Sequence, residues 1–271
     1  MQNETRVHTR RVRDLLQINS PFTFHQYLFD QAFARYGDIV GEGNWGSALA
    51  ICSEYNEPQM IPAHPFSEIV LTGFGDQAED VARYCEYDPR VSYECQNAEC
   101  LPYDSGSFDV VVCKEGLHHL ARPILGVYEM LRIARKAVVI IEPYQTFFGN
   151  LLEQFGLASV YERNYDRNIN YRDNYVFRFD RKMLESILNS YYIDSAYQLE
   201  LYVGWMRWNV TGSSKWPIRL AGAFGGRCVS MLPGSRGNYM TAIIQPGSDL
   251  PSDPEPFQGP EAVLQQAGHT P

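Results

Sequence analysis

The sequence predicts one α/β domain built on a mostly parallel sheet with helices around it. Short apolar, β-branched runs at 68–73, 108–113 and 136–143 are typical of strands buried on both faces. Helical spacing lies between such runs, most clearly at 123–135, and this alternation implies right-handed crossovers between parallel strands. A chain of 271 residues that is 45% hydrophobic can bury one substantial core.

Composition excludes several classes of function. The net charge of −9 repels nucleic acid, and the basic stretch from Arg6 to Arg13 is read as a solvated helix face rather than a nucleic-acid arm. No apolar run approaches the length of a membrane span, and the polar start lacks a signal-peptide core. The six cysteines form no CxxC pair. We therefore expect reduced thiols, no membrane partner and a cytoplasmic location.

The remaining segments fit around this core. We expect N-terminal helices within 1–36, a strand near 38–40, glycines, and then a helical run from 47 onward. The aromatic stretch 144–192 is expected to be a cap-like insertion that includes a helix at 181–192. Runs at 198–208 and 238–246 are expected to be the last strands. The domain is thus predicted over 1–246, followed by a disordered tail at 247–271 that is rich in Pro, Gly and acidic residues.

The middle of the chain carries the strongest motif. After a strand at 91–95 it reads QNAECLPYDSGSFDVVVCKEGLHHLARPILGVYEMLRIARKAVVIIEP. In order, spacing and residue types this stretch resembles the class I methyltransferases that use S-adenosylmethionine. Their pattern runs acid-Ala-Glu-x-Leu-Pro, a polar turn, Ser-Phe-Asp, a valine-rich strand, Leu-His-His and a helix containing Glu and Arg. The resemblance implies a Rossmann-like, seven-stranded methyltransferase fold, S-adenosylmethionine as cofactor, and methyl transfer to a small-molecule acceptor.

The resemblance also implies cofactor contacts by position. Asn97 and Ala98 would lie beside the adenine, with Glu99 in the same loop. Lys114 and Glu115 would lie at the carboxyl end of their strand, facing the cofactor and the acceptor, where ligands bind in open α/β sheets.

Two glycine segments are candidates for further cofactor contacts. Gly41-x-Gly43-x-x-Gly46 is expected to follow a short strand and open a helix, so that the backbone can approach the ligand, with Glu42 as a displaced substitute for the family's acid. Gly73 and Gly75 end the next strand, and Asp76 is the nearest match to the acid that binds the ribose hydroxyls. A helix N-cap is the alternative role for Asp76.

Catalytic candidates follow from proton chemistry. His118 or His119 is expected to accept a proton from an acceptor hydroxyl or amine, with His119 favoured as the residue in the cleft and Glu115 or the strand-end Glu142 as carboxylate alternatives. A structural cap on the following helix is the alternative role for the histidines. No third ligand has suitable spacing for a metal site.

The acceptor is expected to be a metabolite, natural product or glycoside. Expected acceptor contacts are His118, Tyr144 and Tyr175, because an aromatic run can enclose such a molecule. Two alternatives stay open: a catalytically degenerate methyltransferase-fold binding protein, and a nicotinamide oxidoreductase suggested by the glycine spacing alone. A homodimer is possible on either interpretation.

Overall fold

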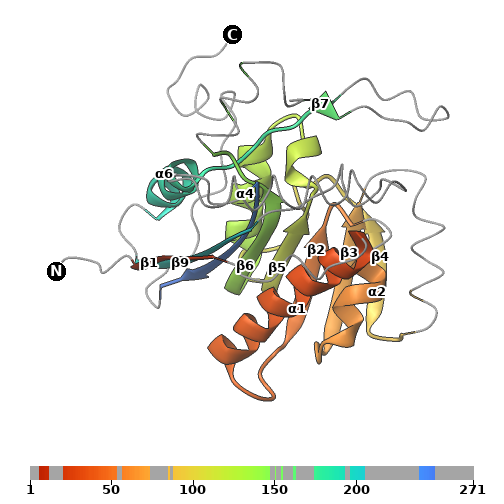
Figure 1. Cartoon of the computed structure of the whole chain (residues 1–271). Coiled ribbons are helices and arrows are strands. Elements are labelled where there is room, and N and C mark those ends of the chain that lie inside the picture. Colours follow the sequence, from red (N-terminus) through yellow and green to blue (C-terminus); the bar gives the residue numbers. More distant parts are fainter. Residues whose placement is uncertain are drawn as a thin grey trace, which may run out of the picture.

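The architecture is an open α/β sheet with helices on both faces (Figure 1). The computed structural model describes residues 6–11, 21–53, 57–73, 85, 88–146, 150, 154, 161–162, 174–192, 196–204 and 238–247. Eight strands form the main sheet in the order β1-β9-β10-β6-β5-β2-β3-β4. Their bounds are Arg6–Arg11 (β1), Ser47–Ile51 (β2), Glu68–Gly73 (β3), Val91–Cys95 (β4), Phe108–Lys114 (β5), Ala134–Pro143 (β6), Tyr197–Gly204 (β9) and Tyr239–Pro246 (β10).

One strand of this sheet runs against the others. Strands β2 to β6 pair in parallel, whereas β10 is antiparallel to both β6 and β9. The strands from β4 to β9 make up the mostly parallel, seven-stranded sheet that the sequence analysis expected, which confirms the predicted fold class. Strand β1 adds an eighth strand at the edge by pairing in parallel with β9.

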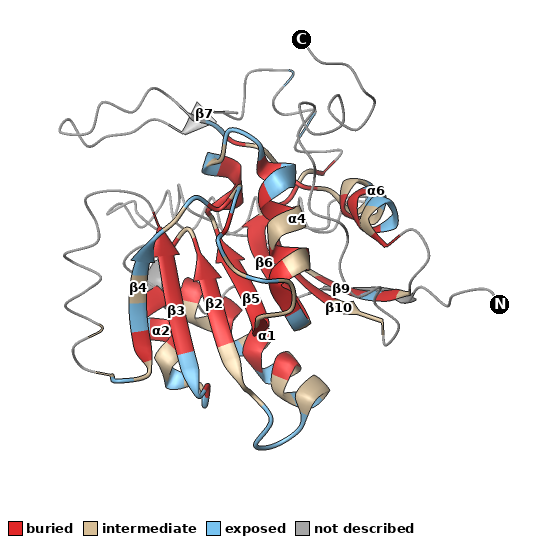
Figure 2. Cartoon of the chain, turned by 180° about the vertical axis from the view of Figure 1, so that it is seen from behind, coloured by how far each residue is buried: buried red, intermediate tan, exposed pale blue. Residues whose placement is uncertain are grey.

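Helices cover the two faces of the sheet separately. Helices α1 (Pro21–Val40) and α2 (Glu57–Met60), with the short helix η2 (Ile61–Ala63), pack on one face through apolar residues that include Phe29, Phe33 and Met60. Helices α4 (Pro123–Ile133) and α6 (Arg181–Tyr191) pack on the other face through residues that include Met130 and Leu188. The central strands are buried between these layers (Figure 2), as their continuous apolar runs predicted.

The N-terminal part differs from expectation in two respects. Residues 6–11 form strand β1 where only helices were expected within 1–36. Helix α1 runs on to Val40, so the strand expected near 38–40 is absent and the helical run expected from residue 47 is instead strand β2. A run of five apolar residues does not by its periodicity distinguish a strand from a helix, and pairing with β3 and β5 decides here.

The glycines between α1 and β2 have structural roles. Gly41 takes a φ of +78°, and its N–H donates to the carbonyl of Gly37 over 2.8 Å, which is the usual way a glycine ends a helix. Gly43 and Gly46 also have positive φ, and the segment between α1 and β2 that contains all three glycines forms the loop at the bottom of Figure 1. The prediction that this segment follows a strand and opens a helix is therefore wrong.

The expected cap is described only in part. Strands β7 (Tyr161–Glu162) and β8 (Asn174–Tyr175) form a small antiparallel pair. The helix predicted at 181–192 is confirmed as α6, which packs on the main sheet rather than standing over it. Residues 74–84 and 86–87, and the tail after Gly247, lie outside the described residues. In the described part of the chain, no helix has the length and apolar character required to traverse a bilayer.

Candidate active site

The carboxyl ends of β2, β3, β4, β5 and β6 meet at one edge of the sheet. The strand order reverses between β2 and β5, because the chain proceeds from β2 to β3 and β4 on one side and from β5 to β6 on the other. In open α/β sheets, ligands bind outside the carboxyl ends of the strands at such a switch point. This edge is therefore the candidate active site.

The segment that follows β2 begins with Cys52 and Ser53 and continues in the sequence as Glu54-Tyr55-Asn56, without a glycine. Cys52 takes a φ of +55°, a conformation that glycine adopts most readily. Ser53 is held by its own N–H, which donates to the carbonyl of Thr72 over 2.7 Å. The first strand of the parallel half thus ends in the backbone shape of a glycine-type turn, formed by a cysteine.

The predicted glycine loop is not at this edge. Gly41, Glu42, Gly43 and Gly46 precede β2 and so lie at the amino end of the strands, opposite the carboxyl edge. Gly46 is packed so closely that a Cβ there would lie 2.0 Å from Oδ2 of Asp109. These four residues are accordingly outside the candidate site.

A buried ionic cluster, formed by His25, Glu57, Lys114 and Glu115, joins α1 and α2 to the end of β5. Lys114 Nζ lies 2.9 Å from Glu115 Oε2 and 3.6 Å from Glu57 Oε1, and His25 Nε2 lies 3.3 Å from Glu115 Oε2. Burial lowers the pKa of His25 to about 4, against the opposing charge of Glu115, so this imidazole is neutral at pH 7.

Glu115 itself has an unusual backbone and a stabilised charge. Its φ is +50°, which a residue with a side chain seldom adopts. Burial alone would raise the pKa of this carboxyl, but Lys114, His25 and Tyr239 together bring the pKa below its ordinary value. Glu115 is therefore a negative charge at neutral pH, paired with Lys114.

Glu142 and His118 form a buried pair at the ends of β6 and β5. Glu142 Oε1 accepts the backbone N–H groups of Gly116 (2.9 Å) and Leu117 (2.7 Å), and Oε2 lies 2.5 Å from His118 Nδ1. Glu142 is 0% and His118 3% exposed. His119 is exposed, with its ring 4.2 Å from that of His118 between centroids. The structure thus singles out His118, not the favoured His119, as the imidazole oriented by a carboxylate.

The loop after β4 brings the predicted adenine residues to the same edge. Asn97 Oδ1 accepts the N–H of Glu99 over 3.0 Å, and Ala98 is buried. Glu99 accepts the backbone N–H of Arg122 (2.6 Å) and pairs with its guanidinium (2.7 Å). Glu99 therefore fastens this loop to the start of α4, while Asn97 keeps its amide N–H groups and one lone pair for other partners.

The end of β3 is described only as far as Gly73. A Cβ on Gly73 would lie 2.9 Å from the carbonyl oxygen of Ser53, so this position requires glycine for the close approach of β2 and β3. Gly75 and Asp76, the predicted ribose residues, lie outside the described residues.

Aromatic residues border the site beyond β6. Tyr144 is buried and forms a bridge with Phe179, whose carbonyl accepts the N–H of Gln145 over 2.8 Å. Tyr175, on β8, is 56% exposed, and β8 contacts the short helix η4 (Leu117–His119) that carries both histidines. Of the two tyrosines predicted to contact the acceptor, Tyr144 is buried two residues after Glu142, and Tyr175 is exposed on β8.

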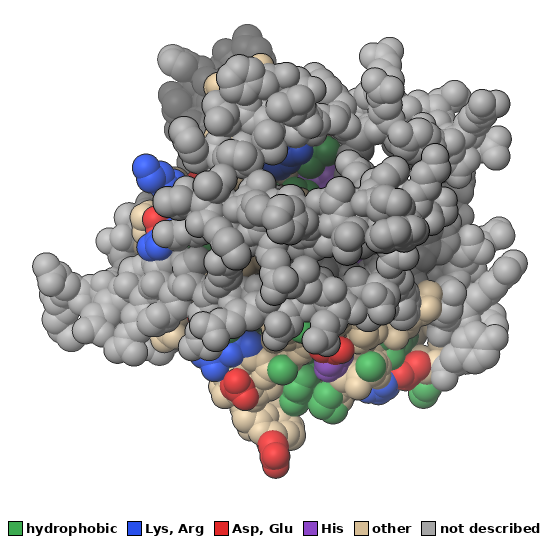
Figure 3. Space-filling view, in the orientation of Figure 1, with side chains coloured by type: hydrophobic (Ala, Val, Ile, Leu, Met, Phe, Trp, Pro, Cys, Tyr) green, Lys and Arg blue, Asp and Glu red, His purple; other side chains and the backbone are tan. Residues whose placement is uncertain are grey.

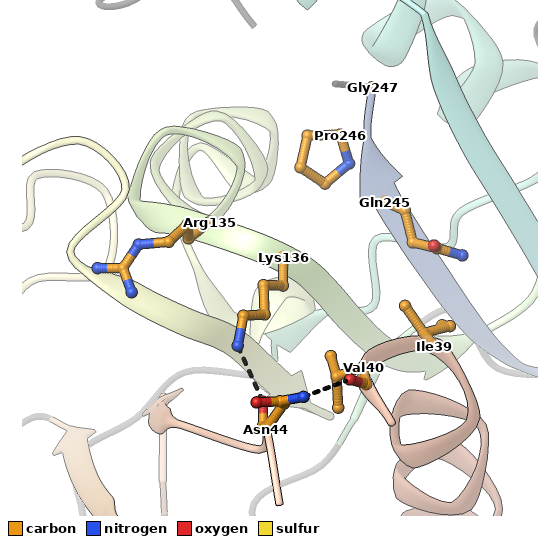
Figure 4. A pocket seen from close by; sticks show the side chains of 8 residues that line it. All are labelled: Ile39, Val40, Asn44, Arg135, Lys136, Gln245, Pro246 and Gly247. Carbon is orange, nitrogen blue, oxygen red and sulfur yellow. Dashed lines mark hydrogen bonds between the residues drawn. The ribbon is translucent and has the colours of Figure 1, made fainter. Parts of the chain in front are cut away.

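The opposite edge of the sheet has a groove of its own (Figure 4). It has a volume of about 640 Å³ and is lined by Ile39, Val40, Asn44, Arg135, Lys136, Gln245, Pro246 and Gly247. Its lysine donates to the carbonyl of Asn44 over 2.8 Å and lies 3.0 Å from Asp109, and Arg135 lies 3.2 Å from the same carboxylate. Both cations are thus occupied by structural partners.

The described part of the chain gives no support for a bound metal ion or for a nucleic-acid surface. No three His, Cys, Asp or Glu side chains gather there as a metal site would require. Described basic side chains on the face shown in Figure 3 are interspersed with acidic ones, so they form no continuous basic patch there.

Comparison with known proteins bears on the family and the fold. The family model described as a methyltransferase domain matches residues 61–141, from η2 to β6. No curated protein matches the chain in sequence.

Solved structures resemble the chain in fold at low sequence identity. YcgJ from Bacillus subtilis has a TM-score of 0.56 at 13% identity, over 83% of this chain and 100% of that one. An S-adenosylmethionine-dependent methyltransferase from Methanosarcina mazei has a TM-score of 0.51 at 13% identity, over 75% and 93%. The [4+2]-cyclase SpnF has a TM-score of 0.50 at 14% identity, over 83% and 81%.

The sheet order, the carboxyl-edge site and the matched domain define a class I methyltransferase fold of the Rossmann-like type. The methyltransferase-domain match spans residues 61–141, and the similarity to solved structures shows the fold that S-adenosylmethionine-dependent methyltransferases share.

Several residues of the site were missed from the sequence. His25 and Glu57 lie far from the central motif, and a lone histidine in an aromatic helix gives no signal of a partner 90 residues away. Cys52 and Ser53 were missed because the true first strand was read as a helix. The available signal was Gly41, which follows a long helical pattern at the position where glycine ends helices.

Proposed function

We propose that the protein transfers a methyl group from S-adenosylmethionine to a hydroxyl or amine of a small organic acceptor, with His118 as the base for a hydroxyl. The observation that carries this proposal is the buried Glu142–His118 pair at the carboxyl edge, 2.5 Å between Oε2 and Nδ1. The oriented imidazole favours the hydroxyl, because an amine that is already deprotonated needs no base.

Residues at this edge suit the chemistry of the cofactor. Its amino-acid end carries one positive and one negative charge, which Glu115 and Lys114 match. The positive φ of Cys52 gives the segment after β2 a glycine-like backbone, and Asn97 with Ala98 offers amide groups to the adenine. Gly73 and these residues would hold the group. When bound, it supplies a methyl group on a positively charged sulfur.

Glu142 determines which nitrogen of His118 is basic. Two backbone N–H groups fix Glu142, and its second oxygen accepts the Nδ1–H of the imidazole, so Nε2 is the nitrogen that accepts a proton. The carboxylate also stabilises the imidazolium that forms when the acceptor hydroxyl loses its proton. The chain's part would be to orient the acceptor hydroxyl toward the methyl group that the bound cofactor would supply, and to take up the hydroxyl proton at His118 Nε2.

The other carboxylate candidate is less suited to proton transfer. Glu115 is paired with Lys114 over 2.9 Å, and its pKa is below the ordinary value, so it binds a proton weakly. Its role in the proposal is to hold charge. His119 is exposed beside His118 and serves as a comparison position.

The acceptor is proposed to bind between Tyr144 and Tyr175, beside η4. The contact of β8 with η4 and the aromatic character of both residues support a flat or ring-containing molecule, such as an aromatic metabolite, natural product or glycoside. The open position of Tyr175 leaves this side accessible to a free small molecule.

Turnover of variants tests the proposal. Purified protein is supplied with S-adenosylmethionine and a panel of phenols, alcohols, amines and glycosides, and released S-adenosylhomocysteine is measured. For a hydroxyl acceptor, His118→Gln should lower kcat by about 10²- to 10⁴-fold and remove the rise of the rate with pH. Glu142→Gln should lower kcat in the same direction, because the amide N–H₂ cannot accept the Nδ1–H.

His119→Gln is the matched control and should keep both kcat and the pH profile. Affinity for S-adenosylhomocysteine should be unchanged in all three variants, which separates proton transfer from cofactor binding. Equal losses in His118→Gln and His119→Gln would contradict the assignment of the base.

A second candidate function rests on the absence of glycine after β2. Cys52, rather than a glycine, takes the positive φ after β2. A segment without glycine could retain the fold while losing productive cofactor binding. The protein would then be a catalytically degenerate member that binds a small molecule at the same edge. Failure of S-adenosylmethionine and S-adenosylhomocysteine to bind would favour this candidate.

A further inference from the structure

Tyr93, in the middle of β4, has a buried hydroxyl with no hydrogen-bond partner in the described part of the chain. Burial, with a smaller effect of Cys95, raises the pKa of this phenol, so it remains a protonated donor at neutral pH. Buried polar groups are almost always hydrogen-bonded, and an unpaired one is destabilising. A donor left unpaired in the protein alone is therefore a candidate contact for a ligand.

The Tyr93 hydroxyl lies at the carboxyl edge of the sheet, where the candidate site is. Tyr93 pairs with Leu71 of β3, two residues before Gly73. A Cβ on Gly73 would lie 3.0 Å from the Tyr93 hydroxyl and 2.9 Å from the Ser53 carbonyl. The hydroxyl thus lies where the ends of β2, β3 and β4 converge, and the glycine leaves room for it there.

The same edge carries the loop after β4. Gln96, two residues before Ala98, donates its N–H to the carbonyl of Gly73 over 3.2 Å, which ties this loop to the end of β3. Asn97 and Ala98 lie four and five residues after Tyr93 in the chain, in the loop that this hydrogen bond ties to Gly73. A nucleoside bound between the end of β3 and this loop would lie next to the Tyr93 hydroxyl.

We propose that the Tyr93 hydroxyl donates a hydrogen bond to the nucleoside half of S-adenosylmethionine. This inference rests on the proposed function, because it requires the cofactor at the carboxyl edge. It assigns a binding role to a strand residue that neither motif nor spacing marks. The described end of β3 supplies no carboxylate to accept hydrogen bonds. The phenol hydroxyl beside Gly73 would instead donate one.

The test compares Tyr93→Phe with the unchanged protein in calorimetric titrations with two ligands. S-adenosylhomocysteine contains the whole framework, and 5′-methylthioadenosine contains the nucleoside without the amino-acid end. Tyr93→Phe removes one oxygen and should weaken both ligands by the same factor, about 5- to 30-fold. The melting temperature without ligand should be unchanged or higher, because an unpaired buried hydroxyl is removed.

Tyr197→Phe is the matched control. Tyr197 lies on β9, which is near the opposite end of the strand order from β4. It is also buried, but its hydroxyl donates a hydrogen bond to Oδ1 of Asn189 on α6 over 3.0 Å. This variant should lower the melting temperature and leave both affinities unchanged.

The outcomes separate the two proposals. Equal affinities in Tyr93→Phe and the unchanged protein would overturn the role of Tyr93 while leaving the proposed function intact. A loss for S-adenosylhomocysteine alone would overturn the contact with the nucleoside. If the unchanged protein bound neither ligand, the proposed function would fail and the role of Tyr93 with it.

Discussion

Gly46 shows at the residue scale how a motif can mislead. It has a φ of +69°, and Asp109 fills the space where a side chain would begin. That carboxylate accepts the N–H of Ser47 over 2.9 Å and pairs with Arg135 and Lys136. The glycine is required by this buried network and by the backbone, with no ligand involved.

Gly46→Ala should therefore lower the free energy of unfolding by about 3 kcal/mol, from left-handed strain and the displaced Asp109 carboxylate. Chemical denaturation measures this change. Gly43→Ala is the control: its φ is +78°, but no atom lies within 4 Å of the added Cβ. It should lose only about 1 kcal/mol.

Neither substitution should change affinity for S-adenosylhomocysteine, because the turn lies at the amino edge of the sheet. Selective loss of affinity in Gly43→Ala would restore the glycine turn to the cofactor site.

Individual site residues were predictable when the motif fixed their place along a strand. Asn97, Ala98, Lys114, Glu115 and His118 all lie at the carboxyl edge, since their positions follow directly from strands that the sequence marks clearly. The choice between the two histidines was not predictable. It depends on the short helix η4, which buries one ring against Glu142 and exposes the other.

At the scale of elements, strands buried on both faces were recognisable and the first parallel strand was not. Strands β3, β4 and β5 and helices α4 and α6 match the predicted segments closely. Strand β2 is only five residues long, and the glycines before it suggested the start of a helix. Sheet pairing overrides such local signals. The glycine segment therefore follows a helix and precedes a strand, the reverse of the prediction.

Attachment of α1 to the sheet predicts a pH dependence of stability. The pKa of His25 falls from 6.5 to about 4 on folding, so the folded state binds fewer protons than the unfolded state between these values. The stabilising contribution is complete above pH 6.5 and decreases as the pH falls toward 4. Its upper limit is roughly 3 kcal/mol.

Urea denaturation of the unchanged protein and His25→Asn at several pH values measures this contribution. The variant cannot titrate at this position, so its stability should fall less steeply between pH 6.5 and 4. The lowered pKa of Glu115 acts in the same direction in both proteins, and its contribution is lost as the pH falls through that pKa. Parallel curves for the two proteins would contradict the neutral, buried state of His25.

On the scale of the whole molecule, the two edges of the sheet serve different purposes. The amino edge is fixed by Asp109 and its cations, and its groove is lined by groups already engaged with one another. The carboxyl edge gathers the ionic cluster, the Glu142–His118 pair and the loop after β4. The proposed reaction therefore lies at the edge opposite the Asp109 network.

We propose that this carboxyl edge binds S-adenosylmethionine, and calorimetric titration of the purified protein with S-adenosylhomocysteine measures that binding. We predict one site with micromolar affinity, a binding free energy of about −8 kcal/mol. The absence of binding to S-adenosylhomocysteine and to S-adenosylmethionine, in folded protein, would contradict the account.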